Sequence, residues 1–426
     1  MTIYSLNRVG YTFILYSIYF GFVLGDILTI WNPEYYGTFY FFGVPVRDIV
    51  LILVLLFFLI DRKMIFSLAS RRFIFLYVLI LVYYTFQGII MSGFSGWTRA
   101  DLRYFLWFLG GICFGTLIIR TGEIKKNLER ITVLTAIFML TAALLGGEFR
   151  SAISLRIVDY GRILESGVYN FGGLLYIPLI LSFTMKNGSR DNQIVPLAGI
   201  CILFVIGVIL TNTRSMGIIL VVVLLLYILS FGIENNGVVI EKVRAGKQLF
   251  FAAAAGIVVA FLFVYALSID ARLERMLNIS GIVISEELRY LEAVSFYGQG
   301  ITDNTLFFGK GLGGTVVSPV SDWDATGVMH IGILNFWMKM GLAPFIVVSV
   351  YLFVVLPCKY IAELVQRASV YDYAKTADLV VLPSLFPWIM NLAMSGGFAP
   401  QDSVFVGVAY VIHREISIHG LRRITS

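Results

Sequence analysis

Three basic side chains, Arg214, Arg289 and His330, have the chemistry and the setting of an anion-binding site. An arginine guanidinium can bind two phosphate or carboxylate oxygens at once. A histidine near pH 7 can accept a proton from a hydroxyl group or donate to a phosphate. Arg214 lies in a turn of a few polar residues between two apolar segments, so we expect its guanidinium at the depth of lipid headgroups. There it could grip a substrate or simply reach toward lipid phosphates.

A glycine-rich run, residues 309–314, separates Arg289 from His330 along the chain. Glycine permits unusual backbone angles and lets the main chain approach a ligand closely. The run does not match a phosphate-binding P-loop, because neither Ser nor Thr follows its lysine. It therefore predicts either a tight turn over a site or a simple flexible turn. Together with two arginines earlier in the chain it supplies the candidate substrate-binding residues, which are Arg156, Arg162, Lys310, Gly311 and Gly313.

Membrane-spanning helices are the elements that must position these residues. Hydrophobic residues make up 59% of the 426 positions and charged residues 14%, whereas soluble domains carry about 25% charged residues. A spanning helix needs about 20 mainly apolar residues. Twelve segments qualify, at 11–30, 46–60, 73–92, 103–120, 131–147, 168–185, 194–211, 215–232, 248–269, 342–358, 379–396 and 404–413. The sequence thus predicts an all-α integral membrane protein of about 12 transmembrane helices, with residues 1–426 forming one membrane domain.

Lysine and arginine positions predict the orientation, because these residues collect in short cytoplasmic loops. A cytoplasmic N-terminus puts 20 of them in cytoplasmic loops and tails and 7 in short outer loops. Both termini are then cytoplasmic, and the polar stretch 270–341 forms one large extracytoplasmic loop between the ninth and tenth helices. No acid or base lies in the middle of a predicted span, where transporters usually hold one. A flippase or exporter is therefore the weaker functional class.

Charge and acid patterns argue against two kinds of partner. The net charge of +6 follows from the topology and does not indicate nucleic-acid binding. The acids of the long loop are spread along it, and no spaced cluster of His and Asp indicates a divalent metal site. We therefore expect no nucleic acid, no metal and no cofactor.

Three pieces of the sequence, in a fixed order, carry a resemblance to a known family. They are Thr213-Arg214-Ser215, then Glu287-Leu288-Arg289 followed by Thr305–Gly313, and then His330 with Leu334, Gly341 and Leu342. In order and spacing they resemble the O-antigen polymerase and O-antigen ligase superfamily of bacterial envelope glycosyltransferases. Two positions depart from the pattern: Ile331 stands where the family often has Asn, and Glu292 falls near where it often has Trp. The resemblance is therefore to the superfamily, and it selects no subfamily.

This resemblance implies a GT-C-like helical bundle with a cavity at the outer face of the bacterial inner membrane. The donor would be an oligosaccharide linked to undecaprenyl pyrophosphate, transferred to a sugar hydroxyl without a metal ion. Arg214 and Arg289 would neutralise the departing pyrophosphate, and His330 would orient or deprotonate the acceptor hydroxyl, or donate to the phosphate. Arg156 and Arg162 would support these residues or guide the glycan.

The acceptor distinguishes the functions that the resemblance allows. A polymerase of O-antigen, exopolysaccharide or capsule adds the glycan to another lipid-linked repeat unit, whereas a ligase adds it to the lipid A core. We favour the polymerase, because polymerases are the more diverse group. Membrane lipids, a flippase and a chain-length regulator are the expected partners, and a lipid-linked glycan flippase is the alternative from a different class.

Overall fold

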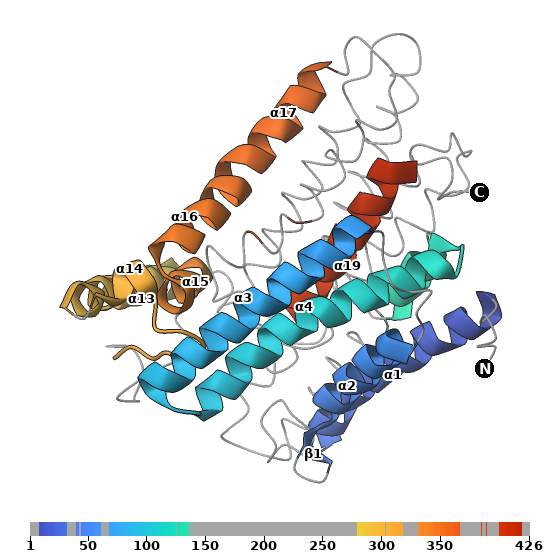
Figure 1. Ribbon diagram of the computed structural model, residues 1–426, viewed down its shortest axis with the longest axis horizontal. Coiled ribbons are helices and arrows are strands. Elements are labelled where there is room, and N and C mark those ends of the chain that lie inside the picture. Colours follow the sequence, from blue (N-terminus) through green and yellow to red (C-terminus); the bar gives the residue numbers. More distant parts are fainter. Residues whose placement is uncertain are drawn as a thin grey trace.

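The computed structural model describes residues 8–31, 40–41, 44–60, 68–124, 126–134, 137, 279–302, 304–317, 331–366, 385, 389 and 400–419. Its main helices are α1 (Arg8–Trp31), α2 (Val46–Ile60), α3 (Leu68–Ser92), α4 (Gly96–Arg120), α13 (Ile279–Thr302), α14 (Thr305–Phe308), α15 (Gly332–Met340), α16 (Leu342–Val350), the π-helix η4 (Tyr351–Val355), α17 (Leu356–Gln366) and α19 (Pro400–His419) (Figure 1). Two-residue strands β1 (Tyr40–Phe41) and β2 (Val44–Pro45) form an antiparallel pair. Because 89% of the described part is helical, the predicted helical class is confirmed.

Three described helical stretches are long and apolar enough to cross a membrane. They are Arg72–Ser92, Gly96–Arg120 and Leu342–Ala362, the last running through α16, η4 and α17. The chain is therefore a membrane protein, as its composition indicated. Six of the twelve predicted segments overlap α1, α2, α3, α4, the α16–α17 stretch and α19. The segments 168–185, 194–211, 215–232 and 248–269 lie outside the described residues, as do most of 131–147 and 379–396.

The neighbouring helices α3 and α4 have opposite surroundings. The apolar window of α4 is 67% buried, whereas that of α3 is 11% buried. The exposed side chains of α3 include Phe75, Leu79, Phe86 and Ile90, and in water such a continuous apolar surface would be unfavourable. In a bilayer the same surface is compatible with lipid, so α3 has the character of a peripheral span and α4 that of a central one.

Helix α19 runs along α4 (Figure 1), and glycines bring the two backbones together. A methyl group on Gly111 of α4 would collide with the main chain of Val404, and one on Gly407 of α19 would meet the Phe108 carbonyl. Small residues at such contacts let membrane helices pack by close van der Waals contact. This pair forms the centre of the described bundle.

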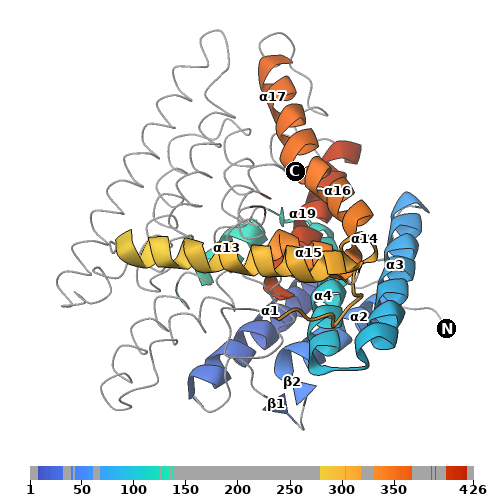
Figure 2. The same cartoon turned by 90° about the vertical axis from the view of Figure 1, so that its left-hand side faces the viewer.

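Much of the stretch predicted as the large outer loop is helical. Helix α13 occupies 24 residues within it, and Figure 2 shows α13 lying across the direction of α3 and α17. The short helices α14 and α15 continue the same stretch. A helix that crosses the ends of spans, and does not run beside them, can hold side chains at one depth of the membrane surface.

Candidate functional site

Half of the predicted site residues fall within the described part of the chain. These are Arg289, Lys310, Gly311 and Gly313, whereas Arg156, Arg162, Arg214 and His330 lie outside it. The helix α15 begins two residues after His330 in the sequence. The description of the site therefore starts from α13, the glycine run and α15.

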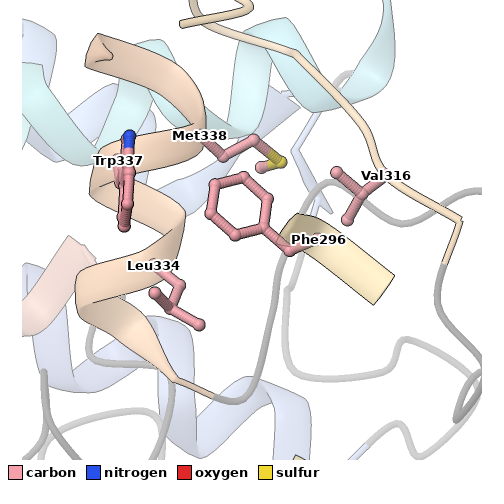
Figure 3. Packing of buried hydrophobic residues seen from close by; sticks show 5 residues of the cluster. All are labelled: Phe296, Val316, Leu334, Trp337 and Met338. Atoms are coloured by element: carbon pink, nitrogen blue, oxygen red, sulfur yellow. The ribbon is translucent and has the colours of Figure 1, made fainter. Parts of the chain in front are cut away.

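Helices α13 and α15 pack together through aromatic side chains (Figure 3). Arg289 is half-buried in the middle of α13, on the face that also carries the buried residues Glu292 and Phe296. The ring of Phe296 meets that of Trp337 of α15 edge-on, with centroids 5.6 Å apart. The indole Nε1 of Trp337 donates to the carbonyl of Leu306, 2.6 Å away. The helix bearing Arg289 is thus fixed against the helix that follows His330.

The glycine run, Gly309–Gly314, lies between α15 and the ends of α3 and α4. Its main chain forms hydrogen bonds to α15 on one side and to α3 on the other. The amides of Lys310 and Gly311 donate to the carbonyls of Met338 and Lys339 in α15, at 2.7 and 3.0 Å, and the amide of Leu312 donates to Tyr84 of α3, at 2.9 Å. Gly311 has φ of +76°, and a side chain there would collide with the backbone of Gly88 in α3. Only glycine fits this conformation and this contact at low cost.

A buried ion pair completes the contact with α4. The carboxylate oxygen Oδ2 of Asp101 accepts from the Lys339 ammonium at 2.5 Å and from the amide of Gly313 at 2.6 Å. Asp101 is 5% exposed and Lys339 1%. Burial lowers the pKa of Lys339 from its ordinary value, and the neighbouring carboxylate opposes that effect. We refer to Gly309–Gly314, Asp101 and Lys339 as the glycine clasp.

Apolar contacts and two polar side chains of α3 hold the clasp from the other side. Leu312 is fully buried in a cluster with Leu81, Tyr104, Phe105 and Met340. A second set of hydrogen bonds comes from side chains of α3. The amide of Gln87 donates to the carbonyls of Phe308 and Gly309, and the hydroxyl of Tyr84 donates to the carbonyl of Met340. The glycine run is therefore a tight, anchored turn, and the flexible-turn alternative does not describe it.

The predicted substrate-binding groups of the run have protein partners. The amides of Gly311 and Gly313 donate to Lys339 and Asp101, so neither amide is directed to a ligand in this structure. The ammonium of Lys310 donates to the Thr315 carbonyl at 3.0 Å. These contacts suit a role in positioning α15 more than direct contact with substrate.

Asp101 is the main residue of this region that the sequence reasoning missed. The predicted span started at residue 103, but α4 begins at Gly96, so Asp101 lies inside a candidate span. A signal was present: Ser95 is a preferred residue for a helix N-cap, and in the structure it forms a reciprocal capping box with Thr98 at the start of α4. Extending the helix to that cap would have shown a carboxylate one turn inside an apolar helix.

A scan against protein-family models and searches of curated proteins and of solved structures found no match to this chain.

Proposed function

We propose that this protein is a membrane glycosyltransferase that polymerises surface polysaccharide, using oligosaccharides linked to undecaprenyl pyrophosphate as donors. The observation that supports the proposal best is the packing of two pieces of the family resemblance as one unit. The helix bearing Arg289, the glycine run and the helix after His330 are joined by the Phe296–Trp337 contact and by main-chain bonds at Met338 and Lys339. Residues separated in sequence but grouped in the motif are thus neighbours in space.

The roles follow from the chemistry of the side chains. Arg289, with Arg214, stabilises the negative charge that grows on the departing pyrophosphate. His330 orients or deprotonates the acceptor hydroxyl, or donates to the phosphate. Within the glycine clasp, Gly311, Gly313 and Lys310 hold α15, the helix that follows His330 in the sequence, against α3 and α4.

The position of the clasp agrees with the predicted orientation. It contacts the C-terminal part of α3 and the N-terminal part of α4, on either side of the turn at Gly93–Ser95. The count of Lys and Arg residues assigns that turn to the outer face, where a donor exposed after flipping would be found. The catalytic unit and its donor would then share one membrane surface.

The test is the surface glycan of a strain that lacks this protein, complemented with wild-type or variant chains. We expect R289A to reduce the rate of polymer formation by about a hundred- to a thousand-fold, the typical cost of one transition-state charge contact. R289K, which keeps the charge and loses the planar fork, should recover only part of the activity. R99A is the matched control, because Arg99 is an exposed arginine in the first turn of α4, the end of that helix that the glycine clasp contacts.

Each glycan phenotype assigns one function. Single repeat units on the final acceptor, or lipid-linked units accumulating outside, support the polymerase. Long chains that remain on undecaprenyl pyrophosphate identify a ligase, and lipid-linked units trapped on the cytoplasmic side identify a flippase. An unaltered glycan in the deletion strain would refute all three, and equal losses in R289A and R99A would refute the role of Arg289.

A further inference from the structure

A cavity of about 460 Å³ lies among the described helices, separate from the glycine clasp. Its walls come from α3, α4, α15, α19 and the α16–η4–α17 stretch. Eight of its 18 described lining residues are aromatic, and the wall is mainly ring and aliphatic carbon. The hydroxyl of Tyr77 donates to the Phe105 carbonyl at 2.9 Å. A stable internal water needs two to four polar partners, so this wall suits an apolar occupant.

The cavity is long and narrow and runs along the spans. Its lining residues reach from Ser403 to His413 on α19 and from Val347 to Leu356 on the α16–η4–α17 stretch. Ten residues of helix rise about 15 Å, which is half of a hydrocarbon core of about 30 Å. Spread over about 15 Å, a volume of about 460 Å³ corresponds to a mean width of about 6 Å. One hydrocarbon chain fits this width, whereas two need about 8 Å because carbon atoms pack at roughly 3.5–4.0 Å.

One side of the cavity is open to the surroundings of the protein. Val347 and Tyr351 line the cavity and are 69% and 48% exposed. Both lie in the candidate span Leu342–Ala362, whose apolar window is 17% buried. A membrane span with this exposure faces lipid, so a hydrocarbon chain of the bilayer can enter the cavity from the side.

The direction of α19 shows which end of the cavity is which. Gly111 of α4 lies against the main chain of Val404 of α19. Gly115, one turn later in α4, lies against Val408, so the two helices run in the same direction. The end of the cavity at His413 is therefore toward the C-terminal end of α4, and Figure 1 shows α17 reaching the same side, away from α13, α14 and α15.

Basic residues gather at this end. Three elements each place one beside a lining residue, and these are Arg72 of α3, Lys359 of α17 and Arg414 of α19. Arg72 and Lys359 are exposed, and Arg414 donates to the hydroxyl of Tyr410, which lines the cavity, at 3.4 Å. The described helices carry four basic and two acidic residues here, namely Arg71, Arg72, Lys359, Arg414, Glu363 and Glu415. The charge balance of this end is thus positive.

Among the described residues, the opposite end of the cavity has no such excess. The basic residues beside its lining residues, Arg103 and Lys339, form ion pairs with Asp48 and Asp101. The count of Lys and Arg residues assigns the basic end to the cytoplasmic face. Anionic phospholipids of that face attract basic side chains, and basic pockets between membrane helices there bind their headgroups.

We propose that this cavity binds one acyl chain of an anionic phospholipid from the cytoplasmic leaflet, with the lipid phosphate at Arg72, Lys359 and Arg414. The width admits a single chain, and the length is that of one leaflet. The open side gives the chain access from the bilayer, and the basic residues select a negative headgroup. This site is separate from glycan transfer and does not depend on the function proposed above.

Photolabelling of the full-length protein tests the proposal. Purified protein is placed in phosphatidylcholine nanodiscs that contain a small fraction of a diazirine phospholipid, illuminated, and digested for mass spectrometry. The probe is phosphatidylglycerol or phosphatidylcholine with identical acyl chains, and its diazirine lies either near the ester or at the end of the chain. Gel filtration selects folded protein before illumination.

We expect phosphatidylglycerol to label the α19 wall at least about twentyfold more than phosphatidylcholine, since each basic residue near an anionic headgroup contributes about fivefold. The diazirine near the ester should label the chain around Tyr410 and His413, and the one at the chain end should label it around Ser403 and Val406. A V348W substitution, which fills the cavity, should lower the labelling by both probes. V350W is its control, because Val350 is exposed and does not line the cavity.

The charge variants test the headgroup site. R72Q/K359Q should leave a preference for phosphatidylglycerol of about fivefold or less. R99Q/K126Q is the matched control, because it removes the same charge from two exposed residues that do not line or flank the cavity, and it should keep the wild-type preference.

Four results would overturn the proposal. They are equal labelling by the two phospholipids, a reversed order of the two diazirine positions along α19, labelling that V348W leaves unchanged, and equal losses of preference in the two charge variants. None of these readouts involves a glycan, so an unaltered surface glycan in the deletion strain would refute the proposed function and leave this proposal standing.

Discussion

The glycine clasp and the cavity of about 460 Å³, lined by residues of α3, α4, α15, α19 and the α16–α17 stretch, border the same nine-residue helix, α15, and are opposite in character. In the clasp, the amides from Gly309 to Gly314 each donate to a protein acceptor, and the charges of Asp101 and Lys339 neutralise each other. In the cavity, mainly apolar side chains, with Ser403 and His413 among them, line open space. The difference shows how each region contributes: a region whose hydrogen bonds are complete holds other groups in position, whereas a cavity leaves side-chain surface open to a further group.

Removing the Asp101 carboxylate should give the largest loss of stability. D101A takes away the group that neutralises the buried Lys339 ammonium, and breaking such a pair costs about 3–5 kcal/mol. Chemical unfolding of the purified protein in detergent measures the change. The double variant D101A/K339M should regain much of the loss, because it removes the buried charge as well.

The matched control is D48A. The Asp48–Arg103 ion pair has a similar N–O distance, 2.8 Å, but its side chains are 21% and 31% exposed. Because this pair keeps partial access to solvent, its loss should cost less than that of the clasp pair, about 1–2 kcal/mol. A D48A protein as unstable as the D101A protein would mean that the deeper burial of the clasp pair does not increase the loss of stability.

Replacing Gly311 should be the next largest change. G311A forces a side chain into a positive-φ position and against the Gly88 backbone, and we expect a loss of about 2–4 kcal/mol from strain and overpacking. Thermal unfolding in detergent checks it. The control is G298A on α13, where an added methyl group meets nothing within 4 Å. A stable G311A would show that the clasp is looser than its contacts indicate.

A single hydrogen bond of the clasp should have a smaller effect. Y84F removes the hydroxyl that donates to Met340 at 2.9 Å, which should cost about 1 kcal/mol. Y83F is its neighbour in sequence, and Tyr83 is 62% exposed, so it should change stability by less than about 0.5 kcal/mol. Denaturant unfolding of both variants side by side would contradict the prediction if Y83F were the less stable.

Filling the cavity should have the smallest effect on stability. Because Val348 borders open apolar space, V348F should change the free energy of unfolding by less than about 1 kcal/mol in either direction. The comparison would fail if V348F destabilised the protein as much as G311A does, since that result would mean the space is closed to larger groups. Detergent unfolding curves for the two variants settle the ranking.

The sequence was most informative where apolar runs are uninterrupted. The predicted segment 46–60 coincides with α2, because Pro45 precedes it and residues 49–60 are all apolar. Helix α4 begins seven residues before the predicted segment 103–120, since a hydropathy window counts Arg99 and Asp101 against a span and cannot know that Asp101 has an ionic partner. An ionic partner offsets the free-energy cost of burying a charge, and which residues pair depends on the three-dimensional fold.

For the candidate site, the sequence located the pieces but not their neighbours. The glycines of the run indicated unusual backbone angles, and positive φ is found at Gly309, Gly311 and Gly313. Their partners on α3 and α4 were not foreseen, because bonds from amides to carbonyls leave no mark in the side-chain pattern. The paired motif pieces were predicted to act together, and their contact through Trp337 required three-dimensional information.

The Asp101–Lys339 pair has a consequence for how the chain is made. The two residues are separated by 238 positions, so a ribosome that adds about 5–20 residues per second completes Asp101 roughly 12–48 s before Lys339. During that interval α4 is present without its later partner, and its carboxylate must remain hydrated or protonated. The last contact of the clasp therefore forms late in biogenesis, and a chain that stops before α15 keeps an uncompensated acid in α4, a feature by which quality-control proteases could recognise an unfinished protein.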